Sequence, residues 1–229
     1  MVDLDKLDKR ILVELDLDSR QTFSKLAKKL HTSQQVVSYR VNKLTDSGVI
    51  TSFITTVPSI SFGLNIVKIY IQYTGMTNET EKEIYKFLFN HKSVNWVAKT
   101  LGNYDLFIGI MVKNISYLGK FKTEFFEKFG KHINSYTISI LEGAYTYPRP
   151  YLSNKNRKMI KPVLIHKEFS ENLEKIDKQL IKELVDNSRL TVLELSKKLN
   201  LNVKTVIKKI NYLKKSGIIQ SYRINIDRD

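Results

Sequence analysis

The sequence contains one long internal repeat. Aligning residues 4–54 with residues 173–223, an offset of 169, needs no gap and makes about 20 of 51 positions identical. The identities include Ser19-Arg20 with Ser188-Arg189 and Ser47-Gly48 with Ser216-Gly217, and most other apolar positions stay apolar. Such a match predicts that one small domain occurs twice, with a different segment between the copies.

The pattern of each copy predicts three helices. Apolar residues recur at three- and four-residue steps from Leu4 to Leu15, which is typical of one buried helix face. Thr22 is a suitable N-cap for a second, short helix, and His31-Thr32 leaves room only for a tight turn. Ser33 then begins a third helix, which Gly48 ends. In the second copy Thr191, Asn202 and Gly217 take the corresponding places.

A β-branched segment follows the third helix in both copies. "VITSFITTV" after Gly48 and "IIQSYRINI" after Gly217 are rich in β-branched and aromatic residues, which favours strands. We expect each to form the small β-hairpin of a wing. Two short helices, a tight turn and a strand pair make a winged helix-turn-helix, whose last helix enters the DNA major groove. A winged helix that binds only protein, or an inert structural copy, is the alternative.

The outward faces of the two third helices differ. The first carries amides and hydroxyls, which can read base edges, and the second carries mainly lysines, which grip phosphates and discriminate bases less. The first copy is therefore predicted to read sequence and the second to act as an electrostatic clamp, although exposed lysines are also usual on a solvated helix. The candidate DNA-binding residues are Ser33, Gln34, Gln35, Ser38, Tyr39, Arg40, Asn42 and Lys43, then Asn202, Lys204, Lys208, Lys209, Lys214 and Lys215.

Charge and composition point to a polyanionic partner. The net charge is +15, of which residues 1–58 carry +2 and residues 171–229 carry +5. Nucleic acid or an acidic membrane surface fits this excess, and a lysine-rich genome would also produce it. No run of 18 apolar residues and no apolar signal core occurs, and there is no cysteine, so we expect a cytoplasmic protein without a membrane span. His31, His91, His132 and His166 lack ligand spacing, so no metal site is predicted.

The segment between the copies alternates strands and helices. Residues 66–73, 94–102, 104–112 and 133–143 read as strands, the middle two joined at the tight-turn dipeptide Gly102-Asn103. Residues 78–90 and 115–129 read as amphipathic helices. The order β-α-β-β-α-β predicts a ferredoxin-like domain with one sheet face left bare for another subunit. The expected fold class is thus α+β, with domains at 1–58, 59–147 and 172–229 and a basic linker at 148–171.

This organisation resembles the Lrp/AsnC ("feast/famine") transcription regulators of bacteria and archaea. The resemblance is carried by "LDKRILVELDLDSRQTFSKLAKKL", "SQQVVSYRVNKLTDSGVI", "FGL" at 62–64 and "GNYDLFIGI" at 102–110, with Arg40 where the family usually has arginine. It implies a sequence-specific, DNA-binding transcriptional regulator. The central domain, called RAM in that family, would form a homodimer or a higher even oligomer. In many members it binds an amino-acid effector near a hairpin motif, and the residues of this chain that match the motif are Gly102, Tyr104 and Asp105.

The chain departs from that family after the central domain. It continues through "YPRPYLSNKNRKMIKPVL", which reads as a stiff exit and a basic linker or phosphate-contacting arm, into the second winged helix. Because the chain stops shortly after the second wing, we expect that a second RAM-type domain was lost or truncated after Asp229. An alternative is a siroheme-decarboxylase-like enzyme, which resembles the same architecture. The sheet segments 66–73 and 96–101 hold no histidine or arginine for a tetrapyrrole, so we expect no enzyme and no cofactor. A ligand sensor that acts through protein contacts is the third interpretation.

Overall fold

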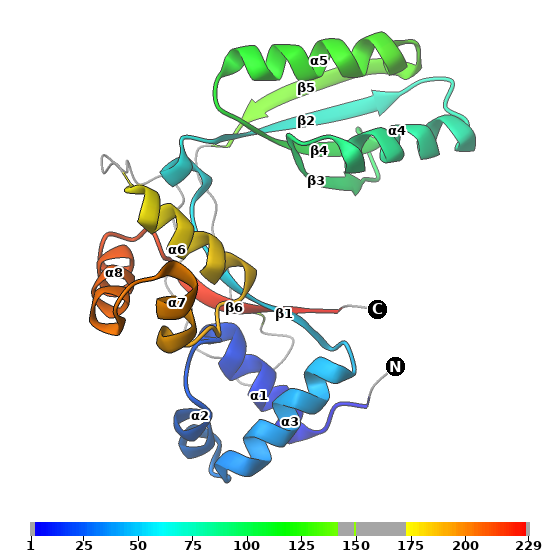
Figure 1. The fold of residues 1–229 in the computed structure, drawn as a ribbon. Helices are drawn as coiled ribbons and strands as arrows, with labels where there is room; N and C mark the ends of the chain where they lie inside the picture. The colour runs from blue at the N-terminus through cyan, green and yellow to red at the C-terminus, as the bar shows by residue number, and fades with distance from the viewer. Residues whose placement is uncertain (1–2, 142–148, 150–172, 228–229) are drawn as a thin grey trace. The chain divides into compact units, whose positions relative to one another are not determined.

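A computed structural model describes residues 3–141, residue 149 and residues 173–227 (Figure 1). The described residues divide into two compact units. The first unit holds residues 3–58 and 173–227 together with Arg149, and the second holds residues 59–141. The predicted linker, with its two prolines and basic run, lies outside the described residues except for Arg149.

Both repeat copies form the predicted three helices. The predicted N-caps are confirmed: the hydroxyls of Thr22, Ser33 and Thr191 and the side-chain oxygen of Asn202 each accept a hydrogen bond from a backbone amide of the helix that follows. Gly48 has φ +77° and Gly217 φ +80°, the left-handed conformation expected where the third helix ends. The helices are α1 Lys6–Leu17, α2 Phe23–Leu30 and α3 Gln34–Asp46, then α6 Lys175–Asp186, α7 Val192–Leu199 and α8 Val203–Lys215.

The prediction that each wing is a β-hairpin is wrong. Each copy supplies only one strand, β1 Ile50–Thr56 or β6 Ser221–Ile226, and these two strands pair antiparallel with each other (Figure 1). The physical reason is local: neither nine-residue segment contains a turn dipeptide, so neither can fold back on itself. The unpaired edge of each strand is instead satisfied by the other copy, and the two copies are therefore one structural unit.

The strand exchange reaches into the core of the first copy. Ile11, Leu26, Val37 and Leu44 are among its buried residues, and Ile224 from the β6 strand of the second copy is fully buried in the same cluster. The apolar faces predicted from helical spacing are thus confirmed, but the core of the first copy also depends on the β6 strand of the second copy.

The second unit has the predicted β-α-β-β-α-β order. Its sheet has the strand order β3-β4-β2-β5 with every neighbouring pair antiparallel, and α4 and α5 cover one face (Figure 1). Phe121, Phe125 and Phe129 of α5 are buried in this core, as their spacing predicted. The elements are β2 Asn65–Tyr73, α4 Asn78–Asn90, β3 Val94–Lys99, β4 Leu106–Val112, α5 Ile115–Phe129 and β5 Ile133–Ile140, with short 3-10 turns at Ser59–Phe62 and Gly130–His132.

The connection between β3 and β4 is longer than the tight turn we expected. Residues 100–105 separate the two strands. The amide of Thr100 donates to the carbonyl of Asp105 at 2.9 Å and closes this loop. Gly102 has φ +114°, which explains why glycine is used there. Among the described residues, no helix has the length and apolar character needed to span a bilayer.

Candidate nucleic-acid interface

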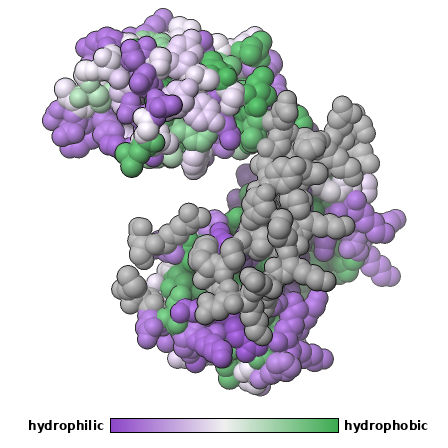
Figure 2. Space-filling model, turned by 180° about the vertical axis from the view of Figure 1, so that it is seen from behind, coloured by the Kyte–Doolittle hydropathy of each residue, from purple (hydrophilic) through white to green (hydrophobic). Residues whose placement is uncertain are grey.

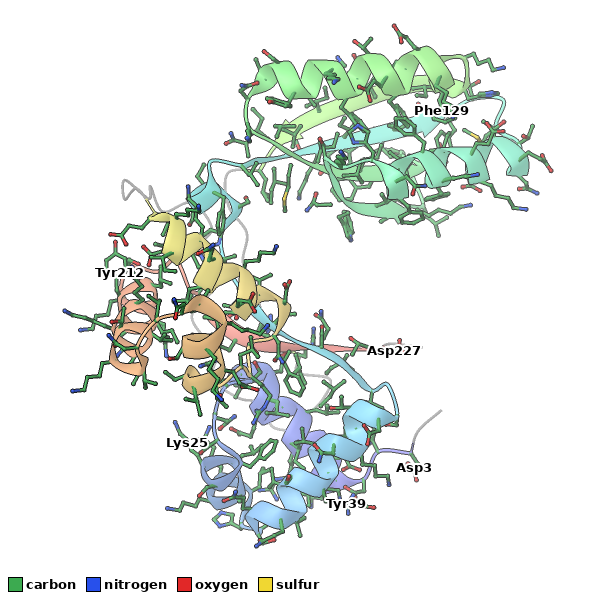
Figure 3. The ribbon with its side chains drawn as sticks, viewed as in Figure 1. Asp3, Lys25, Tyr39, Phe129, Tyr212 and Asp227 are labelled. Atoms are coloured by element: carbon green, nitrogen blue, oxygen red, sulfur yellow. The ribbon has the colours of Figure 1, made fainter. Side chains whose placement is uncertain are left out.

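The α3 helix presents a polar surface over a buried apolar stripe. Val37, Val41 and Leu44 are at most 2% exposed and fix the rotation of the helix about its axis. Tyr39 is 66% exposed and points away from the unit (Figure 3). The remaining outward positions match the sequence prediction: Ser33, Gln34, Gln35, Asn42 and Lys43 are exposed, and Ser38 is half-buried.

The α8 helix presents an equally exposed but cationic surface. It carries five lysines and no acidic residue, whereas α3 has one arginine, one lysine and one aspartate. Hydrophilic side chains lie on both flanks of the first unit in Figure 2. A shallow hollow at the start of α8 combines backbone amides of a helix N-terminus with two cations, a combination that suits a phosphate oxygen. Its lining residues are Asn202, Val203, Lys204, Thr205 and Lys208.

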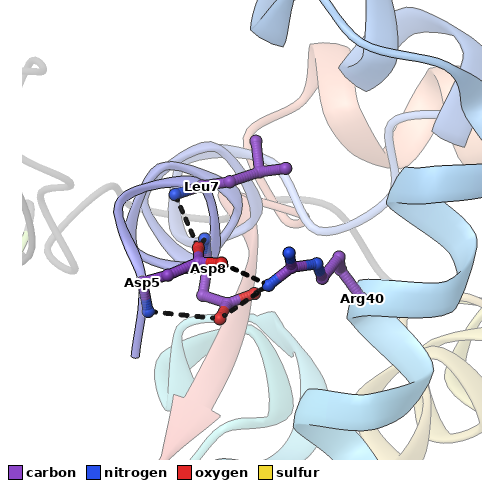
Figure 4. A network of polar contacts seen from close by, with 4 residues as sticks. All are labelled: Asp5, Leu7, Asp8 and Arg40. Atoms are coloured by element: carbon purple, nitrogen blue, oxygen red, sulfur yellow. Dashed lines mark hydrogen bonds and ion pairs between the residues drawn. The ribbon is translucent and has the colours of Figure 1, made fainter. Parts of the chain in front are cut away.

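The Arg40 side chain forms ion pairs within the same winged helix-turn-helix copy. Its guanidinium bonds both oxygens of the buried Asp8 carboxylate at 3.2 Å and also reaches Asp5, the N-cap of α1 (Figure 4). The hydrogen bond to Asp5 raises the pKa of Arg40, and the backbone amide of Asp8 lowers the pKa of Asp5. Arg40 therefore links α3 to the start of α1, because the packing of α3 on α1 brings its guanidinium to Asp5 and Asp8, and its predicted DNA contact stays a prediction.

Lys209 repeats this arrangement in the second copy. Its ammonium lies 2.9 Å from Asp177 and 2.9 Å from Glu174, the residues that match Asp8 and Asp5. Burial lowers the pKa of Lys209, but its hydrogen bonds to Asp177 and Glu174 outweigh burial and leave it above the ordinary value. Lys209 is thus engaged within the protein and its predicted DNA contact stays a prediction, whereas Lys204, Lys208, Lys214 and Lys215 are exposed.

The residues predicted to bind an effector lie at one corner of the second unit. The Asp105 carboxylate accepts a hydrogen bond from the Tyr73 amide at 2.8 Å, so it helps to hold the end of β2. The Tyr104 hydroxyl lies 2.9 Å from that of Thr137 on β5. Gly102 is exposed in the connection between β3 and β4. The three residues are thus neighbours along one loop, with Asp105 and Tyr104 already engaged by the sheet.

Comparison with known proteins is consistent with this geometry. A family model described as winged helix-turn-helix DNA-binding matches residues 4–51 and again residues 173–220. An HTH-type transcriptional regulator of Pyrococcus furiosus is 30% identical over 140 residues, which is 60% of this chain and 91% of the relative. The HTH-type regulator Ptr1 of Methanocaldococcus jannaschii is 31% identical over 121 residues, 53% of this chain and 80% of the relative. The chain belongs to the HTH-type transcriptional regulators.

Solved structures show the fold of this family and its extension. An AsnC family regulator from Agrobacterium tumefaciens has TM-score 0.56 at 21% identity and covers 63% of this chain and 94% of its own. A Neisseria meningitidis regulator in complex with L-Met has TM-score 0.54 at 16% identity, covering 61% and 90%. The siroheme decarboxylase NirDL has TM-score 0.65 at 16% identity and covers 96% of this chain and 65% of its own. Both the regulators and the decarboxylase thus share this fold.

Family membership confirms the predicted class of function, a DNA-binding transcriptional regulator of α+β fold. Sequence reasoning missed the contact between the two copies. Ser19 and Ser188 are fully buried against each other, and the flanking arginines bridge the copies. The signal was present, because these four residues are identical in the repeat although none of them lies on an apolar helix face.

Proposed function

We propose that α3 reads base edges and that α8 grips phosphates, so that the regulator recognises duplex DNA with two unlike helices. The observation that carries this proposal is the contrast between the exposed faces of two otherwise equivalent helices. Gln34 and Gln35 can pair with adenine in a bidentate manner. Lys204 and Lys208 are point charges beside a helix N-terminus, which favours phosphate oxygens over base edges.

The first experiment measures DNA affinity across a salt series, for a genomic fragment selected by the protein and for scrambled duplex. Wild type is compared with Gln35→Ala/Tyr39→Ala and with Lys204→Ala/Lys208→Ala. Lys120→Ala/Lys131→Ala, two exposed lysines of the second unit, is the matched control for the removal of charge.

We expect the first variant to lose preference for the selected fragment, at about 1–3 kcal/mol for each side chain that no longer reads a base. The lysine variant should weaken binding to both duplexes and reduce the salt slope by roughly 0.9 for each phosphate that is no longer neutralised. The control should retain the wild-type slope. If wild type binds neither duplex at low salt, the proposal fails.

We also propose that the uncovered face of the central sheet pairs with a second copy of the chain. Trp96 is 49% exposed there, with its ring 4.5 Å from that of Phe107, which in turn stacks on Tyr70 at 4.6 Å. A contiguous aromatic face of this kind is unusual on a monomer and typical of an interface. Such a homodimer would carry four winged helices and bind DNA with avidity.

Sedimentation of Trp96→Glu tests this homodimer. A charge at the centre of a buried interface should convert the wild-type dimer to a monomer at micromolar concentration. Phe89→Glu on α4 is the matched control, because Phe89 is 73% exposed on an element that covers the opposite face. Equal dissociation of both variants, or a monomeric wild type, would exclude this interface.

An amino acid is the effector class that we propose for the corner formed by Gly102, Tyr104 and Asp105. The L-Met complex of a protein with this fold supports the class, and the half-buried Asp105 carboxylate provides a partner for an ammonium group. Calorimetric titration with each amino acid should give a ligand whose binding Asp105→Asn weakens at least about tenfold. Absence of heat with every amino acid would refute the proposal.

The second candidate is a siroheme-decarboxylase-like activity, which the similarity to NirDL over 96% of this chain favours. The relatives of higher identity carry the name of transcriptional regulators. Within the described sheet, the face left bare by α4 and α5 offers Lys68, Tyr70 and Trp96 but no histidine or arginine for tetrapyrrole carboxylates. Titration with an iron tetrapyrrole decides between them: a shifted, saturable absorption band would favour the enzyme.

A further inference from the structure

The two winged helix-turn-helix copies meet across a local two-fold axis. In the β1–β6 pair Ile54 lies opposite Arg223, its own counterpart in the repeat. The flanking pairs, Phe53 with Ile224 and Thr55 with Tyr222, are exchanged by the same offset of 169. This register is what an isologous dimer interface would show, yet here it lies within one chain.

Side chains at the axis obey the same symmetry. The hydroxyls of Ser19 and Ser188 are 2.7 Å apart and both residues are fully buried. Arg20 donates to the Ser188 carbonyl at 2.6 Å, and Arg189 donates to the Ser19 carbonyl at 2.7 Å. Burial lowers the pKa of both arginines. Because the same residues act from both sides, this part of the surface would also permit two first copies, or two second copies, to pair.

A buried ion pair breaks the symmetry. Asp16 is 4% exposed and accepts two hydrogen bonds from Arg223, at 3.1 Å from Nε and 2.7 Å from Nη2. Arg149 forms a second ion pair with Asp16 at 3.1 Å and also donates to the Ile224 carbonyl at 2.9 Å. The positions related to Asp16 and Arg223 by the repeat are Val185 and Ile54, an apolar pair.

This asymmetry discriminates between the possible pairings. Two first copies would set Asp16 against Ile54 on both sides of the axis, and two second copies would set Arg223 against Val185. Either arrangement buries a charge without its partner, which is strongly unfavourable. Only a first copy with a second copy satisfies every position.

We propose that every DNA-binding unit of this protein contains one α3 and one α8, enforced by the Asp16–Arg223 pair, and therefore binds duplex DNA with two unlike half-sites. This inference rests on the proposed reading and gripping roles of the two helices. It specifies the substrate further: within one unit the site has one half with defined bases and one half recognised mainly through phosphates.

Cysteines placed on the axis test the pairing, because the natural chain has none. In the full-length chain, Ser19→Cys/Ser188→Cys should form a disulfide between the two positions under a mild oxidant, identified by peptide mass mapping. Ser19→Cys alone should give no covalent dimer. In the background Asp16→Val/Arg223→Ile, which makes these positions alike in both copies, Ser19→Cys should begin to link two chains. Ready linking of Ser19→Cys in the unaltered background, or none in the altered one, would overturn the proposal.

Selection from a random duplex library tests the consequence for DNA. Within the stretch of duplex that one unit covers, wild type should enrich a single defined half. Val203→Gln/Lys204→Gln/Ile207→Ser/Lys208→Tyr gives α8 the outward residues of α3, and it should enrich two copies of that half, inverted, within the same stretch. Two defined, inverted halves within the stretch covered by one wild-type unit would overturn the unlike half-sites while leaving DNA binding intact, whereas a homodimer would only repeat the whole unlike site at a larger spacing. If no duplex is enriched at all, DNA binding itself fails.

Discussion

In the first winged helix-turn-helix copy Arg40 bonds Asp8, and in the second Lys209 bonds Asp177 at the matching positions. A second pair also recurs, Lys29 with Glu14 at 2.8 Å and Lys198 with Glu183 at 2.6 Å. The contacts that orient the helices inside each copy have therefore been kept. The exposed faces of α3 and α8, by contrast, carry different residues in the two copies.

The copies also differ on one side of their shared surface. Asp16–Arg223 has no polar counterpart at Val185 and Ile54, although Ser19, Arg20, Ser188 and Arg189 make symmetric contacts. A duplicated domain that pairs with its copy can diverge freely on its outer face, but its inner face must stay complementary. Contacts between helices of one copy have kept residues of the same charge at matching positions. Contacts between the two copies have kept only surfaces that fit each other.

The largest effect that we predict comes from the exchanged strands. Ile224→Ala should lower the free energy of unfolding by about 2–5 kcal/mol, because its side chain is fully buried in the core of the first copy. The matching residue is Thr55, whose hydroxyl donates to the Leu184 carbonyl at 2.5 Å. Thr55→Ala removes a hydrogen bond and less apolar volume, so about 1–2 kcal/mol is expected. Urea unfolding of both variants measures the difference.

Equal losses for the two variants would show that the strands contribute alike to both copies, contrary to the difference in apolar volume between Ile224 and Thr55, which are both buried. A variant at an exposed strand position, Asn225→Ala, is the control, and it should change the unfolding free energy by no more than about 0.5 kcal/mol.

Local signals in the sequence were enough to predict most of the elements. The helices at Asn78–Asn90 and Ile115–Phe129 have the predicted bounds, since caps and apolar spacing are properties of neighbouring residues. The faces of α3 and α8 were predictable for the same reason, as a helix places every third or fourth residue on one side.

Contacts between distant segments were not predictable in the same way. β-Branched segments indicate strands but do not name their partner, so β1 and β6 were each assigned a hairpin of their own. Arg40 has an outward position by spacing alone, and only the packing of α3 on α1 brings it to Asp8. The absence of a turn dipeptide in both wings was the one local sign that their partner lay elsewhere.

A smaller effect should come from the N-cap residue of each copy's first helix. Asp5 caps α1 and accepts hydrogen bonds from the Leu7 and Asp8 amides at 2.8 Å, whereas Glu174 makes no side-chain cap on α6. Asp5→Ala should therefore cost about 1 kcal/mol, and Glu174→Asp should stabilise the second copy by up to about 1 kcal/mol. Thermal unfolding at pH 7 compares them, with Asp3→Ala at an exposed position as the control.

The same cap predicts a pH dependence. The amide of Asp8 and the guanidinium of Arg40 hold the pKa of Asp5 below its ordinary value. A carboxyl with a depressed folded-state pKa stabilises the protein above the unfolded-state pKa of about 3.9, and the contribution is lost as the pH falls through the folded value. The difference in Tm between wild type and Asp5→Ala should thus be constant from pH 7 to about pH 5 and shrink below about pH 4. If the Tm difference between wild type and Asp5→Ala instead grew as the pH fell, the pH dependence would belong to a group other than the Asp5 carboxylate.

The smallest predicted effect separates the two recurring lysine–glutamate pairs. Both lysines are largely exposed, with 42% of the Lys29 side chain and 52% of the Lys198 side chain accessible, but the glutamates differ: 9% of Glu14 is accessible against 30% of Glu183. Lys29→Met leaves a more deeply buried carboxylate, so it should lower Tm by a few degrees, whereas Lys198→Met exposes Glu183 to water and should change Tm by less than about 1 °C. Added salt should reduce the loss of Tm in Lys29→Met only slightly, because the burial of Glu14 limits the screening of its charge. If Lys198→Met lowered Tm more than Lys29→Met did, the stability of the second copy would depend on its surface ion pairs more than the exposure of Glu183 indicates. The exposed lysines of that copy could then not be assigned mainly to DNA binding.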